Sequence, residues 1–326
     1  MKLDKKNILI GLAGILLVQV LILVLLNIFS FQNIKLDQIE KPLVNGVSKE
    51  NIVSFEIKDK LDSFVILKKD GKWMVNTENA FIPGNSTKIT EYLNVLSKLS
   101  SGIIIDKGGD TSSDKVFGFE QKQFQKVIVK TNNKKDFTIA VGSTGSKRGT
   151  SYIRLNDEKK VREISSTISS QTNNQPIDWA EKNIFDKVTE NDVMSVEISS
   201  KFDWYKGDYK LTSKEEKNDK NETKVVFSVE GSNKTYDVDL LKDIVKNIVT
   251  LNVSEYKLNG NITGRDKIGN IRVILKNGKN YLLDFYKADK DDVGNFIVDV
   301  DFNDYLYLIH EDAAKKMFKN LKEIEK

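Results

Sequence analysis

Ile271–Phe285 reads IRVILKNGKNYLLDF, and this stretch indicates how the chain folds. Two runs of alternating apolar residues flank Asn277-Gly278, a residue pair that strongly favours a tight β-hairpin turn. Alternation with a period of two is typical of strands that bury one face of a sheet and expose the other. The stretch therefore predicts an antiparallel sheet with one covered face.

The same hairpin pattern occurs in the first half of the chain, where Asp70-Gly71 separates two apolar runs. Short apolar runs indicate further strands at residues 53–57, 64–67, 73–75, 127–130, 137–141, 152–155, 161–164, 193–198, 224–229, 296–300 and 305–309. Apolar residues three and four positions apart indicate helices at residues 89–99, 238–248 and 313–321. The second half thus repeats the order of the first. Two copies of one strand-rich unit account for this, and chance similarity between two α+β domains is the alternative.

The predicted fold class is α+β, with a single N-terminal transmembrane helix followed by two similar units of mainly antiparallel sheet, each covered by helices. The predicted domains are a cytoplasmic tip and transmembrane anchor (1–31), a tether (32–50), a first α+β unit (51–186) and a second α+β unit (187–326). A charged segment, Ser213–Thr223 (SKEEKNDKNET), is expected to form a mobile insertion in the second unit.

The anchor is predicted from Ile8–Phe29 (ILIGLAGILLVQVLILVLLNIF), a run of 22 residues without a charged side chain. As a helix rising about 1.5 Å per residue, this run would be roughly 33 Å long, enough to cross a hydrocarbon core of about 30 Å. A cleaved signal peptide is the alternative. Its apolar region is usually about 7–15 residues long and ends in a small-x-small site, which is missing after Asn27.

Lysines placed before the apolar run predict the orientation of the anchor. Lys2, Lys5 and Lys6 precede it with only Asp4 against them, and basic residues are retained on the cytoplasmic side of a membrane. The predicted localisation is therefore the cell inner (cytoplasmic) membrane, as a single-pass protein with its N-terminus inside and its bulk in the periplasm.

Charge and cysteine content argue against several classes of function. The formal net charge is +4, but only five of the 51 basic residues are arginines, and 47 acidic residues nearly balance the basic ones. Nucleic-acid sites favour the bidentate guanidinium group of arginine, so nucleic-acid binding is not expected. Because the chain has no cysteine, it has no disulfide and no thiolate nucleophile or metal ligand.

Two stretches and one histidine carry residue types found in active or metal sites, and none fits the required pattern. Gly142–Lys147 (GSTGSK) lacks the glycine spacing and the following helix of a phosphate-binding loop. Asp289–Gly294 (DKDDVG) resembles a calcium loop, but Val293 and Val300 stand where that loop needs oxygen ligands. His310 is the only histidine, which excludes a two-histidine metal site and favours a surface or capping role over catalysis.

Paired carboxylates stay possible because acidic residues are abundant, but no feature of the sequence singles out one pair. The serine residues show no nucleophile-elbow pattern. We therefore predict no catalytic, cofactor-binding or metal-binding residues, no cofactor and no enzymatic activity.

Several weak motifs occur in a fixed order over Val53–Asp186. They are KDGKW at residues 69–73, ITEYLNVLSKLSS at 89–101, FGF at 117–119, a strand closing on Val141-Gly142, the Tyr152-Ile153 strand and DWAEKNIFD at 178–186. Together they resemble the DUF4340 family of bacterial membrane-anchored proteins. The resemblance implies gene neighbours that encode ABC-type export components related to those of gliding-motility systems, and it carries over no functional residue.

The residues and the resemblance together predict a membrane-anchored extracytoplasmic interaction protein, an accessory subunit of an ABC-type transport or gliding-type export assembly. Its expected partners are the membrane and ABC-type transporter subunits. One alternative is a ligand-binding receptor, which needs an apolar pocket between the two units. The other is a carboxylate-dependent glycan hydrolase, which needs two acids about 5–9.5 Å apart in a cleft.

Overall fold

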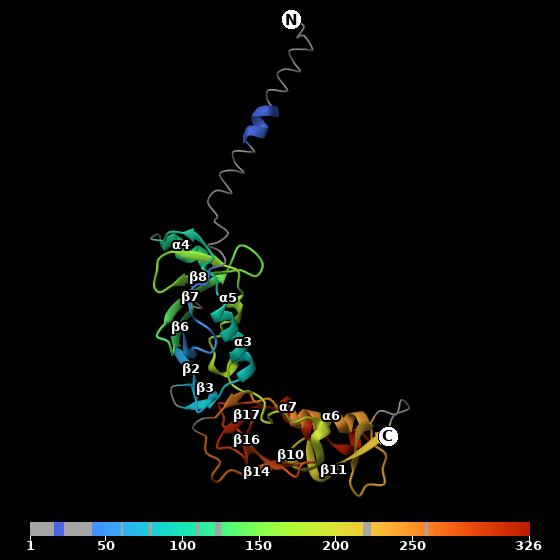
Figure 1. Ribbon diagram of the computed structural model, residues 1–326. Coiled ribbons are helices and arrows are strands. Elements are labelled where there is room, and N and C mark those ends of the chain that lie inside the picture. Colours follow the sequence, from blue (N-terminus) through green and yellow to red (C-terminus); the bar gives the residue numbers. More distant parts are fainter. Residues whose placement is uncertain are drawn as a thin grey trace, which may run out of the picture. The chain divides into compact units, whose positions relative to one another are not determined.

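The structure is a computed structural model of the 326-residue chain, and it describes residues 16–22, 41–59, 61–77, 80–108, 111–120, 125–217, 223–257 and 260–326 (Figure 1). The chain divides into two compact units, Met1–Val65 with Thr90–Asn174 and Ile66–Ile89 with Gln175–Lys326. The two units therefore interleave along the chain. The consecutive units expected at 51–186 and 187–326 were inferred from a repeat in the sequence, and they stay a prediction.

Nine strands form the first sheet, in the order β4-β3-β2-β1-β6-β7-β8-β9-β5. Their bounds are β1 (Ile52–Lys58), β2 (Ser63–Lys69), β3 (Lys72–Asn76), β4 (Phe81–Pro83), β5 (Ile103–Asp106), β6 (Gln125–Thr131), β7 (Phe137–Thr144), β8 (Ser151–Leu155) and β9 (Val161–Ile164). Pairing is antiparallel between β1 and β6, and onward from β6 through β9 to β5. The predicted Asp70-Gly71 turn is confirmed, since φ is 50° at Asp70 and 80° at Gly71, as a tight hairpin turn requires.

Eight strands form the second sheet, in the order β12-β11-β10-β14-β15-β16-β17-β13. Their bounds are β10 (Val193–Phe202), β11 (Tyr205–Lys217), β12 (Thr223–Val229), β13 (Glu255–Tyr256), β14 (Lys267–Leu275), β15 (Asn280–Lys287), β16 (Asn295–Val300) and β17 (Leu306–His310). All neighbouring strands in this sheet pair antiparallel.

The predicted hairpin in Ile271–Phe285 is confirmed, with one difference at its turn. Gly278 N donates to Leu275 O, and Leu275 N donates to Lys279 O, so three residues rather than two form the loop. Gly278 takes the left-handed conformation, with φ of 85°, that a three-residue hairpin loop needs at its last position.

Few helices accompany the sheets. Within the described residues, α3 (Ser86–Ser97) and α6 (Val238–Val249) are the longest, with 12 residues each. The shorter ones are α4 (Thr111–Phe117), α5 (Ile168–Gln171), α7 (Glu311–Met317) and the 3-10 turns η1 (Pro176–Asp178), η2 (Glu190–Asp192) and η3 (Leu321–Glu323). The predicted helices at 89–99 and 238–248 are confirmed, whereas the last helix ends at Met317 instead of 321. The seven residues of α4 are too few to show an apolar period, so the sequence does not predict this helix.

The sequence of α6 explains where it begins and which face it buries. The Asp237 carboxylate accepts hydrogen bonds from Asp239 N at 3.0 Å and Leu240 N at 3.2 Å, which satisfies backbone donors at the helix start. The buried side chains recur at helical spacing and are Leu241, Ile244, Val245, Ile248 and Val249. Figure 1 shows α6 and α7 on the same face of the second sheet. Together they cover its apolar face.

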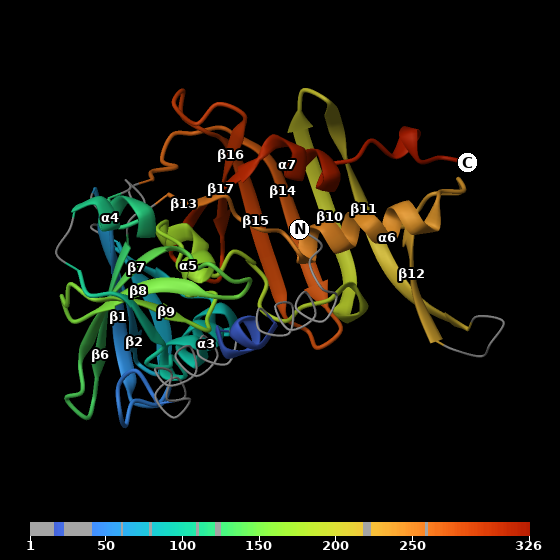
Figure 2. The same ribbon diagram turned by 90° about the horizontal axis from the view of Figure 1, so that it is seen from above.

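The two sheets share one strand order. Each strand of the series β3-β2-β1-β6-β7-β8-β9-β5 has a counterpart, at the same place along the chain, in the series β12-β11-β10-β14-β15-β16-β17-β13. The helices agree as well, because α3 and α6 precede the short edge strands β5 and β13, and α5 and α7 follow the last strand of each series. Two copies of one unit would produce this arrangement. β4 has no counterpart, so β12 is outermost in its sheet (Figure 2).

Alternating side chains on the central strands form the core. Ile139 of β7, and Leu283 and Phe285 of β15, are 0% exposed. These residues lie at the period of two on which the strand prediction was based. Burial of one face of each central strand is therefore the part of the fold that follows most directly from the sequence.

The predicted fold class is wrong in its first element. No helix of the described residues is both long and apolar enough to cross a membrane. Within the predicted anchor, Ile8–Phe29, residues 16–22 are described as helical, and the others lie outside the described residues. The structure supports two mainly antiparallel sheets with few helices instead.

The same finding contradicts the predicted localisation, a single-pass inner-membrane protein with its N-terminus inside and its bulk in the periplasm. That prediction depended on the hydropathy of Ile8–Phe29 alone.

The predicted mobile insertion and the predicted tether are each described only in part. Of the predicted mobile insertion Ser213–Thr223, residues 213–217 continue β11 and Thr223 begins β12, while 218–222 lie outside the described residues. Of the predicted tether, residues 32–40 lie outside them, and Pro42 forms a bridge with Ser100.

We predict that Leu283→Ala and Ile139→Ala each lower the free energy of unfolding by about 2–5 kcal/mol, because each removes buried methyl groups and leaves a cavity. Val293→Ala, at a side chain that is 86% exposed, should change this free energy by less than about 0.5 kcal/mol. Chemical denaturation of the three variants measures the effect. Equal effects at the buried and exposed positions would contradict the placement of Leu283 and Ile139 in the core.

Candidate interaction surface

Of the stretch that resembles a phosphate loop, Gly142–Thr144 end β7, and residues 145–150 form the loop to β8, so a strand rather than a helix follows it. Its polar groups are directed at a carboxylate of the chain itself. Glu163 accepts hydrogen bonds from Ser146 N at 2.8 Å, Ser146 Oγ at 2.8 Å and Thr150 Oγ1 at 2.7 Å. The stretch that resembles a phosphate loop is thus a hairpin loop held by Glu163.

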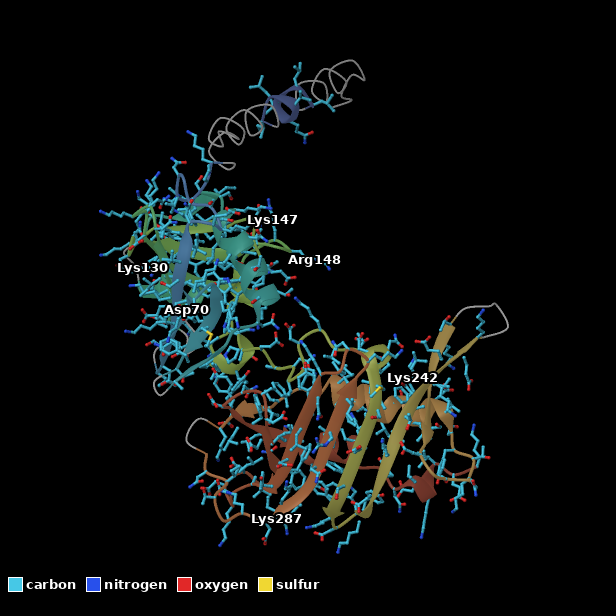
Figure 3. All side chains as sticks on the ribbon, turned by 60° about the horizontal axis from the view of Figure 1, so that its bottom comes forward. Asp70, Lys130, Lys147, Arg148, Lys242 and Lys287 are labelled. Atoms are coloured by element: carbon cyan, nitrogen blue, oxygen red, sulfur yellow. The ribbon has the colours of Figure 1, made fainter. Side chains whose placement is uncertain are left out.

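The carboxylate of Glu163 stays ionised in this setting. Partial burial acts to raise its pKa, but hydrogen bonds from Thr150, Ser146 and Lys147 together lower it. Lys147 and Arg148 extend outward from the loop (Figure 3). The donors at the base of the loop are therefore occupied by the chain's own anion.

Acidic side chains of the loop Asp289–Gly294 pair with basic side chains of the same chain. Asp289 bonds to Arg265 and lies 3.5 Å from Lys257 Nζ, and Asp292 pairs with the same lysine. The hydrogen bond from Arg265 lowers the pKa of Asp289. Within the described ranges, no group of three or more His, Cys, Asp or Glu residues is arranged to hold a metal ion. The loop is a turn stabilised by ion pairs.

His310 precedes α7 and lines an open cleft of about 540 Å³, together with Asn252, Asp312 and Lys316 among others. Its side chain is exposed and makes no capping hydrogen bond, so of the two predicted roles the surface role is the one observed. In the described part of the chain, no hydrogen bond orients the imidazole as a catalytic base requires.

The structure brings together two acids that the sequence analysis did not single out. Asp284 of β15 lies directly opposite Asp299 of β16, and Cβ atoms of such pairs are about 4.5–5.5 Å apart. Lys267 Nζ lies 2.8 Å from Asp284 Oδ2. Burial, and then the nearby Asp284, raises the pKa of Asp299. One acid is therefore ion-paired and the other is more easily protonated, a combination also used by glycosidases.

β5 is an outermost strand of the first sheet, and its three isoleucines are exposed. Ile103, Ile104 and Ile105 are 36%, 47% and 39% exposed. β5 pairs with β9 on one side, and no described strand pairs with its other side. We call Ile103–Ile105 the β5 edge. Successive exposed isoleucines beside an open strand edge form a surface suited to binding another protein.

A family model described as a domain of unknown function, DUF4340, matches residues 73–269, which is more than half of the chain. The chain belongs to the DUF4340 family. The resemblance found in the sequence is thus confirmed, although the matched residues begin later than Val53 and continue beyond Asp186 into β14. No curated protein and no solved structure matches the chain.

The DUF4340 match includes some of the candidate residues and leaves out others. The β5 edge and Glu163 lie within residues 73–269, whereas Asp284, Asp299 and His310 lie after them. The β5 edge is therefore part of the segment that matches the family model, and the acid pair lies outside it.

Sequence reasoning did not identify the β5 edge as a surface. Three successive isoleucines show no polar alternation, and such a run predicts a strand that is buried on both faces. The acid pair was missed for a different reason. Strand register places Asp284 opposite Asp299, and register depends on the pairing of whole strands rather than on local composition.

We predict that Asp299→Asn raises the melting temperature at neutral pH. The pKa of Asp299 in the folded protein lies above its ordinary value of 3.8. Between the ordinary and the raised pKa, the folded state binds more protons than the unfolded state, so the free energy of unfolding falls as pH rises. The gain should disappear as pH falls towards 3.8. Thermal melts across pH measure it.

Asp301→Asn is the matched control. Asp301 Oδ1 accepts a hydrogen bond from Leu282 N at 2.9 Å, so this carboxylate stabilises the folded state. This variant should show no gain at any pH. A gain that persists in acid for Asp299→Asn would contradict the proposed burial of its charge.

Proposed function

We propose that this DUF4340 protein is a non-enzymatic interaction protein, an accessory subunit of an ABC-type transport or gliding-type export assembly. The observation that carries the proposal is the β5 edge, where Ile103, Ile104 and Ile105 are exposed on the outermost strand of a sheet. A partner that covers this apolar surface would gain binding free energy on the order of a few kcal/mol, before the cost of association is subtracted.

The geometry of the β5 edge favours one mode of binding. An extended segment of the partner can add a strand beside β5, so that main-chain hydrogen bonds provide affinity and pockets for alternate side chains provide specificity. The segment should be apolar, because it lies against isoleucines. The class of partner comes from the family resemblance, which implies gene neighbours encoding ABC-type export components.

The non-enzymatic part of the proposal is supported by how the chain uses its own polar groups. The Glu163 carboxylate bonds to the loop that resembles a phosphate site. Asp289 bonds to Arg265, and Asp284 bonds to Lys267. Groups that could bind a ligand or perform acid–base chemistry are thus engaged in stabilising the fold.

A carboxylate-dependent glycan hydrolase is the second candidate, and the Asp284–Asp299 pair is the observation in its favour. Lys267 pairs with Asp284 at 2.8 Å, which argues for a structural role of this acid. Release of sugars from a glycan polymer by the purified chain, lost in Asp284→Asn, would favour the hydrolase. A ligand-binding receptor stays an alternative without a specific observation in its favour.

We predict that ABC-type transporter subunits co-purify with the full chain from cells that make it natively, and that Ile104→Lys removes them. The lysine places a charge on the apolar edge, which a covering strand would have to desolvate. Leu61→Lys is the control, because Leu61 is 82% exposed and lies outside the β5 edge. Mass spectrometry of the purified material identifies the subunits.

The two parts of the proposal fail separately in this experiment. Recovery of the wild-type chain without ABC-type subunits would contradict the accessory role. Recovery of the same subunits with wild type and Ile104→Lys would keep that role but contradict binding at the β5 edge.

A further inference from the structure

β12 is an edge strand without the features that usually protect an edge. It has seven residues and pairs with β11 without a register shift, from Thr223 opposite Lys217 to Val229 opposite Leu211. The other outermost strands are shorter, since β4 has three residues including Pro83, β13 has two, and β5 has four with a register shift. Short length, proline and irregular register keep edges from pairing with other chains.

The outward-facing backbone groups of β12 follow from its pairing with β11. Glu230 N donates to Lys210 O at 2.9 Å, so the even-numbered residues of β12 direct their backbone groups at β11. Val225 and Phe227 therefore direct their N–H and C=O groups outward. Among the described residues outside the strand pairs of the sheet, no backbone group bonds to them.

In the first sheet, the strand at the position that corresponds to β12 is paired with a further strand. β3 is the counterpart of β12 in the shared strand order, and β4 pairs antiparallel with its outer side, with Ile82 opposite Val75. Among the residues that the structure describes, the second sheet has no strand at the corresponding place. The same edge is thus covered by an added strand in one sheet and open in the other.

We propose that β12 pairs with β12 of a second copy of this chain, in an antiparallel dimer whose two-fold axis passes through Val226. In this register Val225 of one copy lies opposite Phe227 of the other, and both residues direct their backbone groups outward. The two pairs form four backbone hydrogen bonds across the axis. The interface is isologous, because each copy offers the same strand to the other.

Side chains match in this register as well. Val225 and Phe227 are 8% and 2% exposed on the covered face of the sheet, and opposite residues point to the same face. The apolar layer therefore continues from one copy into the other. Lys224 lies opposite the neutral Ser228 of the second copy, with the acid Glu230 two residues further along the same face. Within Thr223–Val229, no like charges lie opposite each other, and the one lysine of the strand gains an acidic neighbour.

Exposed apolar residues border the same edge. Lys224 Nζ lies 3.7 Å from Asp239 Oδ1, which places the first turn of α6 beside β12. In that turn, Val238 and Leu240 are 39% and 44% exposed. Figure 2 shows α6 lying across the sheet towards β12. A second copy added at β12 would bring its own α6 to the same side and reduce this exposure.

Disulfide formation tests the register, because the chain has no cysteine of its own. Residues opposite each other in a non-hydrogen-bonded pair have Cβ atoms about 4.5–5.5 Å apart, close to the range of a disulfide. Val226→Cys in the full chain should give a covalent dimer on mild oxidation. Ser228→Cys, which would face Lys224 of the second copy, should react far more slowly.

Sedimentation over a concentration series tests the dimer without a covalent link. Val226→Glu faces Lys214 of β11 within one copy, but it places two carboxylates opposite each other across the axis. We expect its dissociation constant to rise at least about tenfold. Ser228→Glu, which would face Lys224, should keep the dimer.

Each outcome decides the proposal. A wild-type chain that stays monomeric throughout the series would overturn it. So would a dimer that Val226→Glu does not weaken, or equal disulfide formation by the two cysteine variants. Thermal melts of the variants confirm that each is folded. The result is independent of partner binding at the β5 edge, since the two edges belong to different sheets.

Discussion

The need to pair backbone groups at sheet edges is the constraint on which the rest of this structure depends. An open antiparallel sheet leaves two outermost strands, and their outward N–H and C=O groups must bond to water or to another strand. Short strands limit this exposure at β4 and β13. Among the described strands, β5 and β12 each pair on one side only, and one edge is lined by exposed isoleucines while the other is regular over seven residues. The two interactions that we propose use these two edges.

Ion pairs and hydrogen bonds within the chain explain why the candidate chemical sites do not resemble an active site. Glu163 holds the hairpin loop of Ser146 and Thr150, and Arg265 bonds to Asp289 in the turn that resembles a calcium loop. Polar groups that are satisfied within the fold contribute to its specificity and are not preorganised for a reaction. The DUF4340 assignment adds a family but no activity, so the argument for function depends on surfaces.

Local features of the sequence were enough to predict much of the fold. Positive φ at Asp70 and Gly71 gives the first hairpin its turn, and alternation around Leu283 and Phe285 gives a buried face. Features that depend on distant residues were not predictable. The pairing of Asp284 with Asp299 requires the register of whole strands, and the exposure of Ile104 requires the place of β5 at the end of the sheet. Hydropathy of Ile8–Phe29 predicted a spanning helix that the described residues do not contain.

Amide hydrogen exchange of the full chain tests the central claim, that the β5 edge is open in the absence of a partner. The central strands β14 and β15, each paired on both sides, should exchange most slowly. Peptides that cover Ile103–Ile105 should exchange much faster than these. Protection of the β5 edge equal to that of β14 would contradict the account, because it would mean that this strand is already covered.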